Sequence, residues 1–129
     1  MKEILVGSKY TNKMIVNEKD LASSYGSGLA RVYATPAMIA FMEKTSSDYI
    51  AKFLENDEIT VGIKVNIEHI KASPILSEVV CNVEIKEVSG KKIVLSVECL
   101  VNDEIIGKGI HERFVVNHEK FEKRVYEKK

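Results

Sequence analysis

The alternation of apolar and polar residues along the chain predicts five β-strands. The first covers residues 8–16. In the second half of the chain, apolar residues recur at every second position, which is the period of a strand with one buried face. This pattern predicts four further strands, over residues 59–67, 79–85, 93–101 and 104–116. The pairs Ser89-Gly90 and Asn102-Asp103 predict the turns that separate the last three strands.

A long helix is predicted between the first and second strands. Thr35 is a suitable N-cap, and Pro36 is well placed at the first helical position. Residues 37–42 are apolar on all sides, which is typical of a helix buried by its surroundings. The second half of the helix, through Leu54, is amphipathic. A short helical turn is expected after Asn17, and a short helix is compatible with the spacing in the charged tail.

This order of elements predicts a single α+β domain over residues 1–129. One long helix against a curled antiparallel sheet would bury the apolar faces of both. Because residues 37–42 are apolar all round, we expect a second covering surface on the helix. A symmetric dimer would provide it.

Composition and charge narrow the class of protein. The chain has 129 residues, of which 45% are hydrophobic, enough for one core. Lys and Arg number 19, and so do Asp and Glu, so the formal net charge is zero. We therefore expect no binding to nucleic acid or to a membrane surface, because both need a field of positive charge.

Three further features of the sequence bear on the redox state of the cysteines, on metal binding and on location in the cell. Cys81 and Cys99 lie inside apolar strand patterns without a C-x-x-C spacing, which predicts buried free thiols. The apolar run near Met1 is too short for a signal peptide, so we expect a cytoplasmic protein. The three histidines have no metal-ligand spacing, and we predict no metal and no separate cofactor.

Three polar residues occupy positions where the pattern predicts apolar surroundings. Glu43 follows the apolar run of the helix, and Thr35 lies at its start. His69 continues the alternation of the second strand, which directs it toward the core. A helix N-terminus can stabilise an oxyanion, a carboxylate can act as base or nucleophile, and histidine can transfer protons. Each also has a structural interpretation: a helix cap for Thr35, a solvated residue for Glu43 and a satisfied strand-end histidine for His69.

The last strand carries two different faces. Apolar residues share one face, and two glycines share the other with two ionisable residues. The apolar set is Ile106, Ile110, Phe114 and Val116, and the other set is Gly107, Gly109, His111 and Arg113.

Three stretches resemble the fluoroacetyl-CoA thioesterase-like branch of the hotdog-fold superfamily. They are residues 34–43 (ATPAMIAFME), 60–69 (TVGIKVNIEH) and 106–114 (IGKGIHERF). The resemblance extends from about Val6 into the tail. It implies a hotdog fold, a homodimer or dimer of dimers, and hydrolysis of an acyl-CoA at a site near the subunit interface, with coenzyme A as part of the substrate. By motif position it implies that Thr35, Glu43 and His69 are catalytic, and that Gly62 and Arg113 contact the substrate.

One departure from the family pattern bears on the substrate. The segment before Thr35 is the short stretch 25–28, and the phenylalanine-bearing lid of the fluoroacetyl-specific enzyme has no counterpart in it. A short or medium acyl-CoA is therefore expected rather than fluoroacetyl-CoA. Spacing is compatible with either Glu43 or Thr35 as the nucleophile.

Two other functions remain as alternatives to thioester hydrolysis. One is a hotdog dehydratase acting on a 3-hydroxyacyl thioester, and the other is a non-catalytic acyl-CoA-binding protein.

Overall fold

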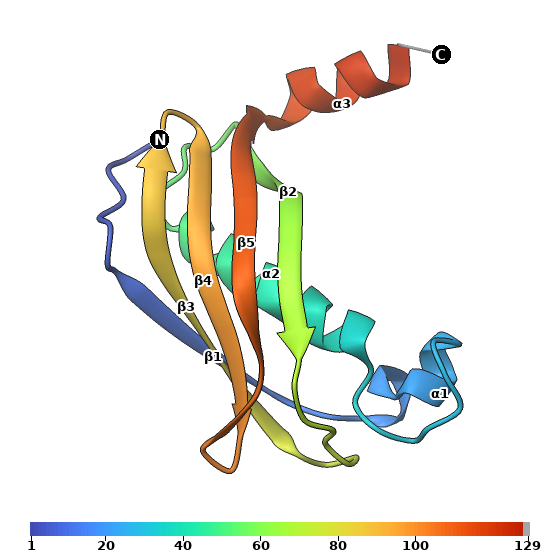
Figure 1. Ribbon diagram of the computed structural model, residues 1–129. Coiled ribbons are helices and arrows are strands. Elements are labelled where there is room, and N and C mark those ends of the chain that lie inside the picture. Colours follow the sequence, from blue (N-terminus) through green and yellow to red (C-terminus); the bar gives the residue numbers. More distant parts are fainter. Residues whose placement is uncertain (128–129) are drawn as a thin grey trace.

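In the computed structural model, a long helix lies against one face of an antiparallel sheet (Figure 1). The helix is α2 (Thr35–Ala51), and the strands are β1 (Lys9–Ile15), β2 (Glu58–His69), β3 (Glu78–Ser89), β4 (Lys92–Val101) and β5 (Glu104–Asn117). The strand order is β1-β3-β4-β5-β2, so β1 and β2 form the two edges. The structure describes residues 1–127, and the last two residues of the predicted domain lie outside this range.

The predicted order of one strand, a helix and four strands is confirmed. The turn expected after Asn17 is a 3-10 helix, η1 (Glu18–Asp20). At its start, the backbone N–H of Asn17 donates to the Asp20 carboxylate at 2.8 Å. A short helix α1 (Ala22–Tyr25) follows and ends at Gly26 in the left-handed conformation. The tail forms α3 (His118–Glu127). No helix within residues 1–127 is long and apolar enough to cross a membrane, and a cytoplasmic location stays a prediction.

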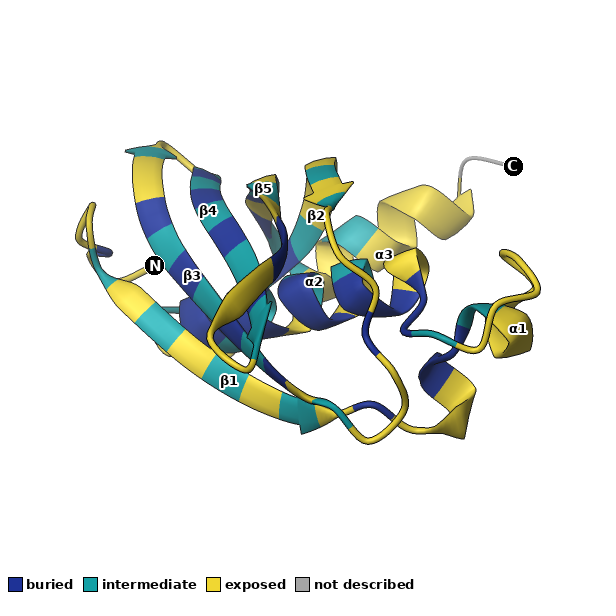
Figure 2. Cartoon of the chain, turned by 60° about the horizontal axis from the view of Figure 1, so that its bottom comes forward, coloured by how far each residue is buried: buried dark blue, intermediate teal, exposed yellow. Residues whose placement is uncertain are grey.

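The hydrophobic core lies between α2 and the sheet. Along β3 and β4, buried residues alternate with partly exposed ones (Figure 2). The predicted burial of both cysteines is confirmed, since Cys81 and Cys99 face each other on neighbouring strands as buried free thiols. The core side chains from these two strands are Val79, Cys81, Val83, Ile85, Ile93, Leu95, Val97 and Cys99.

A β-bulge at Ile63 divides β2 into two parts. The pairing with β5 moves from Gly62 opposite Arg113 to Lys64 opposite Glu112, which leaves Ile63 as an extra residue. Before the bulge, Thr60 and Gly62 face α2, and after it His69 does. The prediction of one continuous apolar face on this strand was therefore wrong. The prediction that His69 points toward the core side is confirmed.

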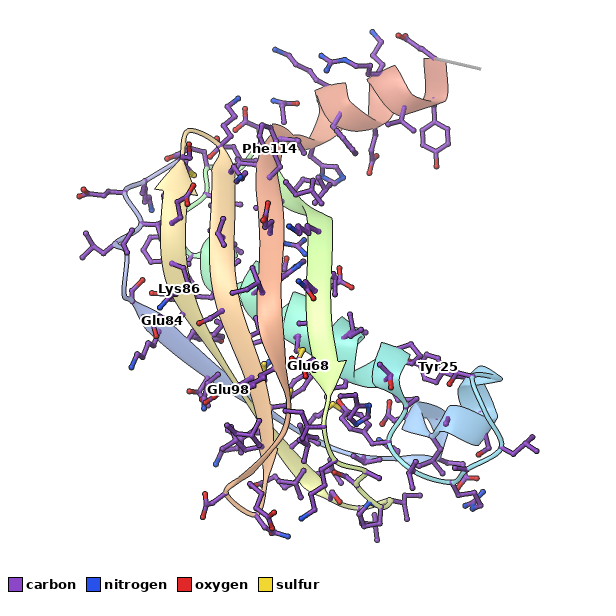
Figure 3. All side chains as sticks on the ribbon, viewed as in Figure 1. Tyr25, Glu68, Glu84, Lys86, Glu98 and Phe114 are labelled. Atoms are coloured by element: carbon purple, nitrogen blue, oxygen red, sulfur yellow. The ribbon has the colours of Figure 1, made fainter. Side chains whose placement is uncertain are left out.

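The polar face of β5 is the one that packs toward α2. His111 and Arg113 are 1% and 7% exposed, whereas Ile110 and Phe114 are 36% and 38% exposed on the opposite surface. Phe114 lies near the α3 end of β5 (Figure 3). Ile106 is buried because the register shifts beside it, so it does not share a face with Ile110. A buried guanidinium costs several kcal/mol unless it is paired, so this face requires specific partners.

Candidate active site

Thr35 and His69 form a hydrogen-bonded pair where α2 begins and β2 ends. Helix α2 starts at Thr35, with Ala34 as its N-cap and no capping bond from a side chain. The Thr35 hydroxyl instead lies 2.7 Å from Nδ1 of His69. The interpretation of Thr35 as a helix cap was therefore wrong. This contact fixes the His69 ring at the N-terminus of α2.

His69 presents a free nitrogen beside this contact. Burial lowers the pKa of His69 below its usual value, so the imidazole is neutral near pH 7. The edge of its ring lies against Tyr33, with centroids 6.5 Å apart. Nε2 is buried and has no hydrogen-bond partner among the described residues. A buried nitrogen without a partner is costly, so its presence beside Thr35 marks this position as a candidate site.

A cavity of about 340 Å³ lies at this pair. It is lined by both catalytic candidates and by residues of the segment before α2, including Ala22, Ser27 and Tyr33. The first helical hydrogen bond of α2 runs from the Met38 amide to the Ala34 carbonyl. The Ala37 amide precedes that bond, so it has no partner inside the helix. Together with the positive end of the helix dipole, it can stabilise negative charge on an oxygen.

Glu43 lies two turns further along α2 and belongs to a second cluster. One carboxylate oxygen, Oε2, is 3.9 Å from Nη1 of Arg113. A Cβ added to Gly62 would lie only 3.0 Å from the same oxygen, so the carboxylate sits directly over this glycine. Glu43 is partly exposed, yet its position is set by an ion pair and by the absence of a side chain at Gly62. The structure thus brings together Glu43, Gly62 and Arg113.

Arg113 is held in this cluster by polar groups of the neighbouring strand β2 and of its own strand β5. Its Nε donates to the Thr60 hydroxyl at 2.8 Å, and Nη2 donates to the Thr60 carbonyl at 3.0 Å. Nη1 lies 3.1 Å from Nε2 of His111. Burial lowers the pKa of Arg113, and the neighbouring Glu43 carboxylate opposes this shift. The role of Gly62 and Arg113 in binding a substrate stays a prediction.

Sequence reasoning did not select His111 or Thr60 as site residues. His111 shares the face of β5 with Arg113 and two glycines, and this grouping is the signal that could have found it. Its Nδ1 lies 2.8 Å from the carbonyl oxygen of Lys64. Burial lowers the pKa of His111, and the charge of Arg113 acts in the same direction. His111 is therefore a neutral imidazole near pH 7.

The two clusters are separate within one chain. Thr35 and Glu43 are eight residues apart on α2, which corresponds to about 12 Å along a helix. Within residues 1–127, no hydrogen bond or ion pair joins the Thr35–His69 pair to the Glu43–Arg113 pair. One chain therefore presents two half-sites: Thr35 with His69 at the start of α2, and Glu43 with Gly62 and Arg113 near its middle.

A larger hollow, of about 650 Å³, lies on the sheet surface that faces away from α2. Glu68, Glu84 and Glu98 line it (Figure 3), together with Lys9 and Lys108. Lys9 is paired in the ladder with Glu84, and Lys108 with both Glu68 and Glu98. Two lysines thus lie opposite three glutamates, and the hollow contains neither half-site. Despite its size, it is not the place where the candidate residues meet.

No group of three or more His, Cys, Asp or Glu side chains among residues 1–127 is arranged to hold a metal ion. Several polar groups of the two half-sites bond to each other or to the neighbouring strand: Thr35 to His69, His111 to the Lys64 carbonyl, and Arg113 to Thr60. The arrangement offers a hydroxyl, a neutral imidazole, a carboxylate and a helix N-terminus. These are groups that can attack a carbonyl, stabilise an oxyanion and transfer a proton.

Comparison with known proteins connects this geometry to one family. The model of the fluoroacetyl-CoA-specific thioesterase family matches residues 16–119. The chain is 29% identical to the fluoroacetyl-CoA thioesterase of Streptantibioticus cattleyicolor, over 95% of this chain and 93% of that protein. A solved structure of the fluoroacetyl-CoA thioesterase FlK superposes with a TM-score of 0.93 at 27% identity, covering 99% of each chain. A hot-dog-like protein from Thermanaerovibrio acidaminovorans superposes with a TM-score of 0.86 at 23% identity, covering 95% and 90% of the chains. The predicted hotdog fold is confirmed.

Proposed function

Because the chain belongs to the fluoroacetyl-CoA-specific thioesterase family and is a thioester hydrolase, we propose that it cleaves a short or medium acyl-CoA with Thr35, Glu43 and His69 as its catalytic residues. The reaction consumes one water and gives the free acid and the thiol of coenzyme A. The predicted class of enzyme is confirmed by the family. The acyl group and the roles of the residues are the proposal.

The observation that carries the proposal is the 2.7 Å contact between the Thr35 hydroxyl and Nδ1 of His69 at the start of α2. With the hydroxyl donating to Nδ1, the proton of the neutral imidazole stands on Nε2. From there it can pass to the departing thiolate, and the imidazole regains a proton from the water that the reaction consumes. The thioester oxygen lies at the helix N-terminus in this scheme, where the Ala37 amide stabilises the oxyanion.

Glu43 supplies the attack on the carbonyl carbon. Its carboxylate either adds directly, forming an anhydride that water then hydrolyses, or removes a proton from an attacking water. The ion pair with Arg113 and the contact over Gly62 support a fixed position for this group. Gly62 and Arg113, the expected substrate contacts, lie in this same half-site.

Pairing of two copies through β2 would join the half-sites. β2 is an edge strand, and its Ile63 and Val65 are 50% and 41% exposed. Gly62 and His69 lie toward opposite ends of this strand. If two copies pair antiparallel about a two-fold axis midway between these residues, the partner subunit's Gly62 comes opposite His69, about 5 Å away between Cα atoms. Each active site would then take Thr35 and His69 from one subunit and Glu43 from the other.

The test is release of free thiol from a panel of acyl-CoAs that runs from acetyl to octanoyl and includes fluoroacetyl-CoA. We expect hydrolysis of one or more short or medium chains by the wild type. We also expect its loss in Thr35→Ala, Glu43→Gln and His69→Ala, with unchanged circular dichroism. Asp48→Asn is the matched control, because Asp48 lies on the same helix and pairs with Lys44, away from both half-sites.

Two other outcomes would point to the other hotdog functions. Conversion of a 3-hydroxyacyl-CoA to the enoyl thioester without release of thiol would identify a dehydratase. Tight binding of acyl-CoA without turnover of any chain would identify a binding protein. Either result contradicts the proposed role of Glu43 as the group that attacks or activates water.

A further inference from the structure

The buried imidazole of His111 lies outside the proposed catalytic set, yet it is bonded to a member of that half-site. We propose that His111 is a positioning residue for acyl-CoA hydrolysis: it fixes the guanidinium of Arg113, which in turn fixes the carboxylate of Glu43. The inference rests on the proposed function of Glu43. It adds a residue that acts on the reaction without touching the substrate.

The two neighbours of His111 select one tautomer of its ring. Nδ1 lies 2.8 Å from the carbonyl oxygen of Lys64, which can only accept, so Nδ1 carries the proton. Nε2 is then an acceptor, and it lies 3.1 Å from Nη1 of Arg113, which can only donate. Both contacts are satisfied by neutral His111. A protonated ring would place a second N–H against the guanidinium.

Each of the three nitrogens of the Arg113 guanidinium donates one hydrogen bond to a protein acceptor. Nε and Nη2 donate to the hydroxyl and the carbonyl of Thr60, and Nη1 donates to His111. These acceptors come from β2 and β5, so they fix both the plane and the tilt of the guanidinium. The side that remains faces Oε2 of Glu43 at 3.9 Å. Arg113 is only 7% exposed, so little of its guanidinium is open to solvent, and its charged partner is Glu43.

The charge that faces Glu43 across the sheet is that of Arg113. From β5 the carboxylate meets Arg113 and neutral His111, and from β2 it meets the backbone of Gly62. Lys44, its neighbour on α2, pairs with Asp48 instead. The orientation of Glu43 therefore depends on Arg113, whose own orientation depends on His111 and Thr60.

Kinetic constants distinguish positioning from direct binding. If His111 fixes Glu43 through Arg113, its loss should lower kcat and leave KM nearly unchanged, because the acyl-CoA still binds. If Arg113 grips the substrate itself, the same change should raise KM. A purely structural role would lower the temperature of unfolding and leave both constants intact.

The experiment compares His111→Leu, His111→Gln and Arg113→Lys with the wild type on the best acyl-CoA of the panel. We expect kcat of His111→Leu to fall about tenfold to a hundredfold, since a displacement of about 1 Å in a reacting group can cost a hundredfold. His111→Gln should retain kcat within about fivefold, because its amide oxygen can accept from Nη1. Arg113→Lys should behave like His111→Leu, because an ammonium cannot serve both Thr60 and His111 in one plane. His118→Leu, which changes an exposed histidine on α3, is the control and should be silent.

A readout that needs no substrate separates failure of this inference from failure of the proposed function. Nitrogen-15 NMR of His111 in the wild type should show a protonated Nδ1 and an unprotonated Nε2. The opposite tautomer, an increase in KM alone, or a His111→Gln variant no better than His111→Leu would overturn the positioning role. If the tautomer is as expected but the wild type releases thiol from no acyl-CoA, the proposed function fails, and the positioning role of His111 in that reaction fails with it.

Discussion

The hydroxyl of Thr35, the first residue of α2, lies 2.7 Å from Nδ1 of His69, the last residue of β2. Thr35 follows the N-cap residue Ala34, so its hydroxyl is not used for capping and can make this contact. Thr35→Val keeps the shape of the side chain and removes the hydroxyl. We expect kcat to fall about a hundredfold or more, as for loss of a group that takes part in proton transfer.

Thr35→Ser is the matched variant, because it keeps the hydroxyl and should keep most of the activity. Both variants should unfold at nearly the wild-type temperature, since no cap is lost. Full activity in Thr35→Val, with kcat measured by thiol release, would show that the hydroxyl only orients the ring of His69.

Gly62→Ala should displace the carboxylate of Glu43. The added methyl group would lie 3.0 Å from Oε2 and 3.3 Å from Cε1 of His111, so the carboxylate must move. We expect a fall in kcat of about tenfold or more, by the same positional argument. The φ angle of Gly62 is not positive, so backbone strain does not contribute.

A double-mutant cycle tests the cause of that loss. In a Glu43→Gln background, Gly62→Ala should cost little more activity, because the group that it displaces no longer functions. Independent, additive losses in kcat would mean that Gly62 contacts the substrate directly and does not act through Glu43.

A heterodimer made of one Thr35→Ala subunit and one Glu43→Gln subunit tests whether the two half-sites come from different chains. If each site combines both subunits, the heterodimer contains one intact site and one doubly altered site. It should then have about half of the wild-type activity, although each parent homodimer is inactive. Two affinity tags allow its purification from co-expressed chains. Sites built within one chain would leave the heterodimer as inactive as its parents.

Stability should fall in mild acid because two histidines are buried in the neutral form. Burial lowers the pKa of both His69 and His111 in the folded chain. Below about pH 6.5, the usual pKa of histidine, the unfolded chain binds protons that the folded chain does not. The free energy of unfolding therefore decreases as the pH falls from this value toward the folded-state pKa values.

The urea concentration at the midpoint of unfolding, measured across this pH range, tests whether stability falls with pH. His111→Gln should flatten the dependence, because one of the two buried titrating groups is gone. An equally steep pH dependence in His111→Gln and in the wild type would assign the effect to His69 and the carboxylates.

The sequence was sufficient for the elements, because hydrophobic periodicity marks the strands and the helix. Thr35, Glu43 and His69 were selected by their positions in a family motif, and their catalytic roles stay predictions. The sequence was not sufficient for the faces of β2 and β5. The alternation of apolar residues carries no sign of an extra residue at Ile63, and an apolar face is normally the buried one. β5 reverses that expectation because it buries His111 and Arg113 against α2, where they bond to groups of β2. Such pairing depends on strand register, which the pattern of one strand does not contain.

The bulge at Ile63 determines which surface of the sheet Gly62 and His69 face. His69 is seven positions after Gly62, and in a regular strand two side chains an odd number of positions apart point to opposite surfaces. The extra residue restores the phase, so both positions face the helix. Deletion of Ile63 would leave every catalytic candidate in the chain and still turn one half-site out toward solvent. The number of residues between Gly62 and His69 therefore matters to the proposed active site as much as the identity of these two residues.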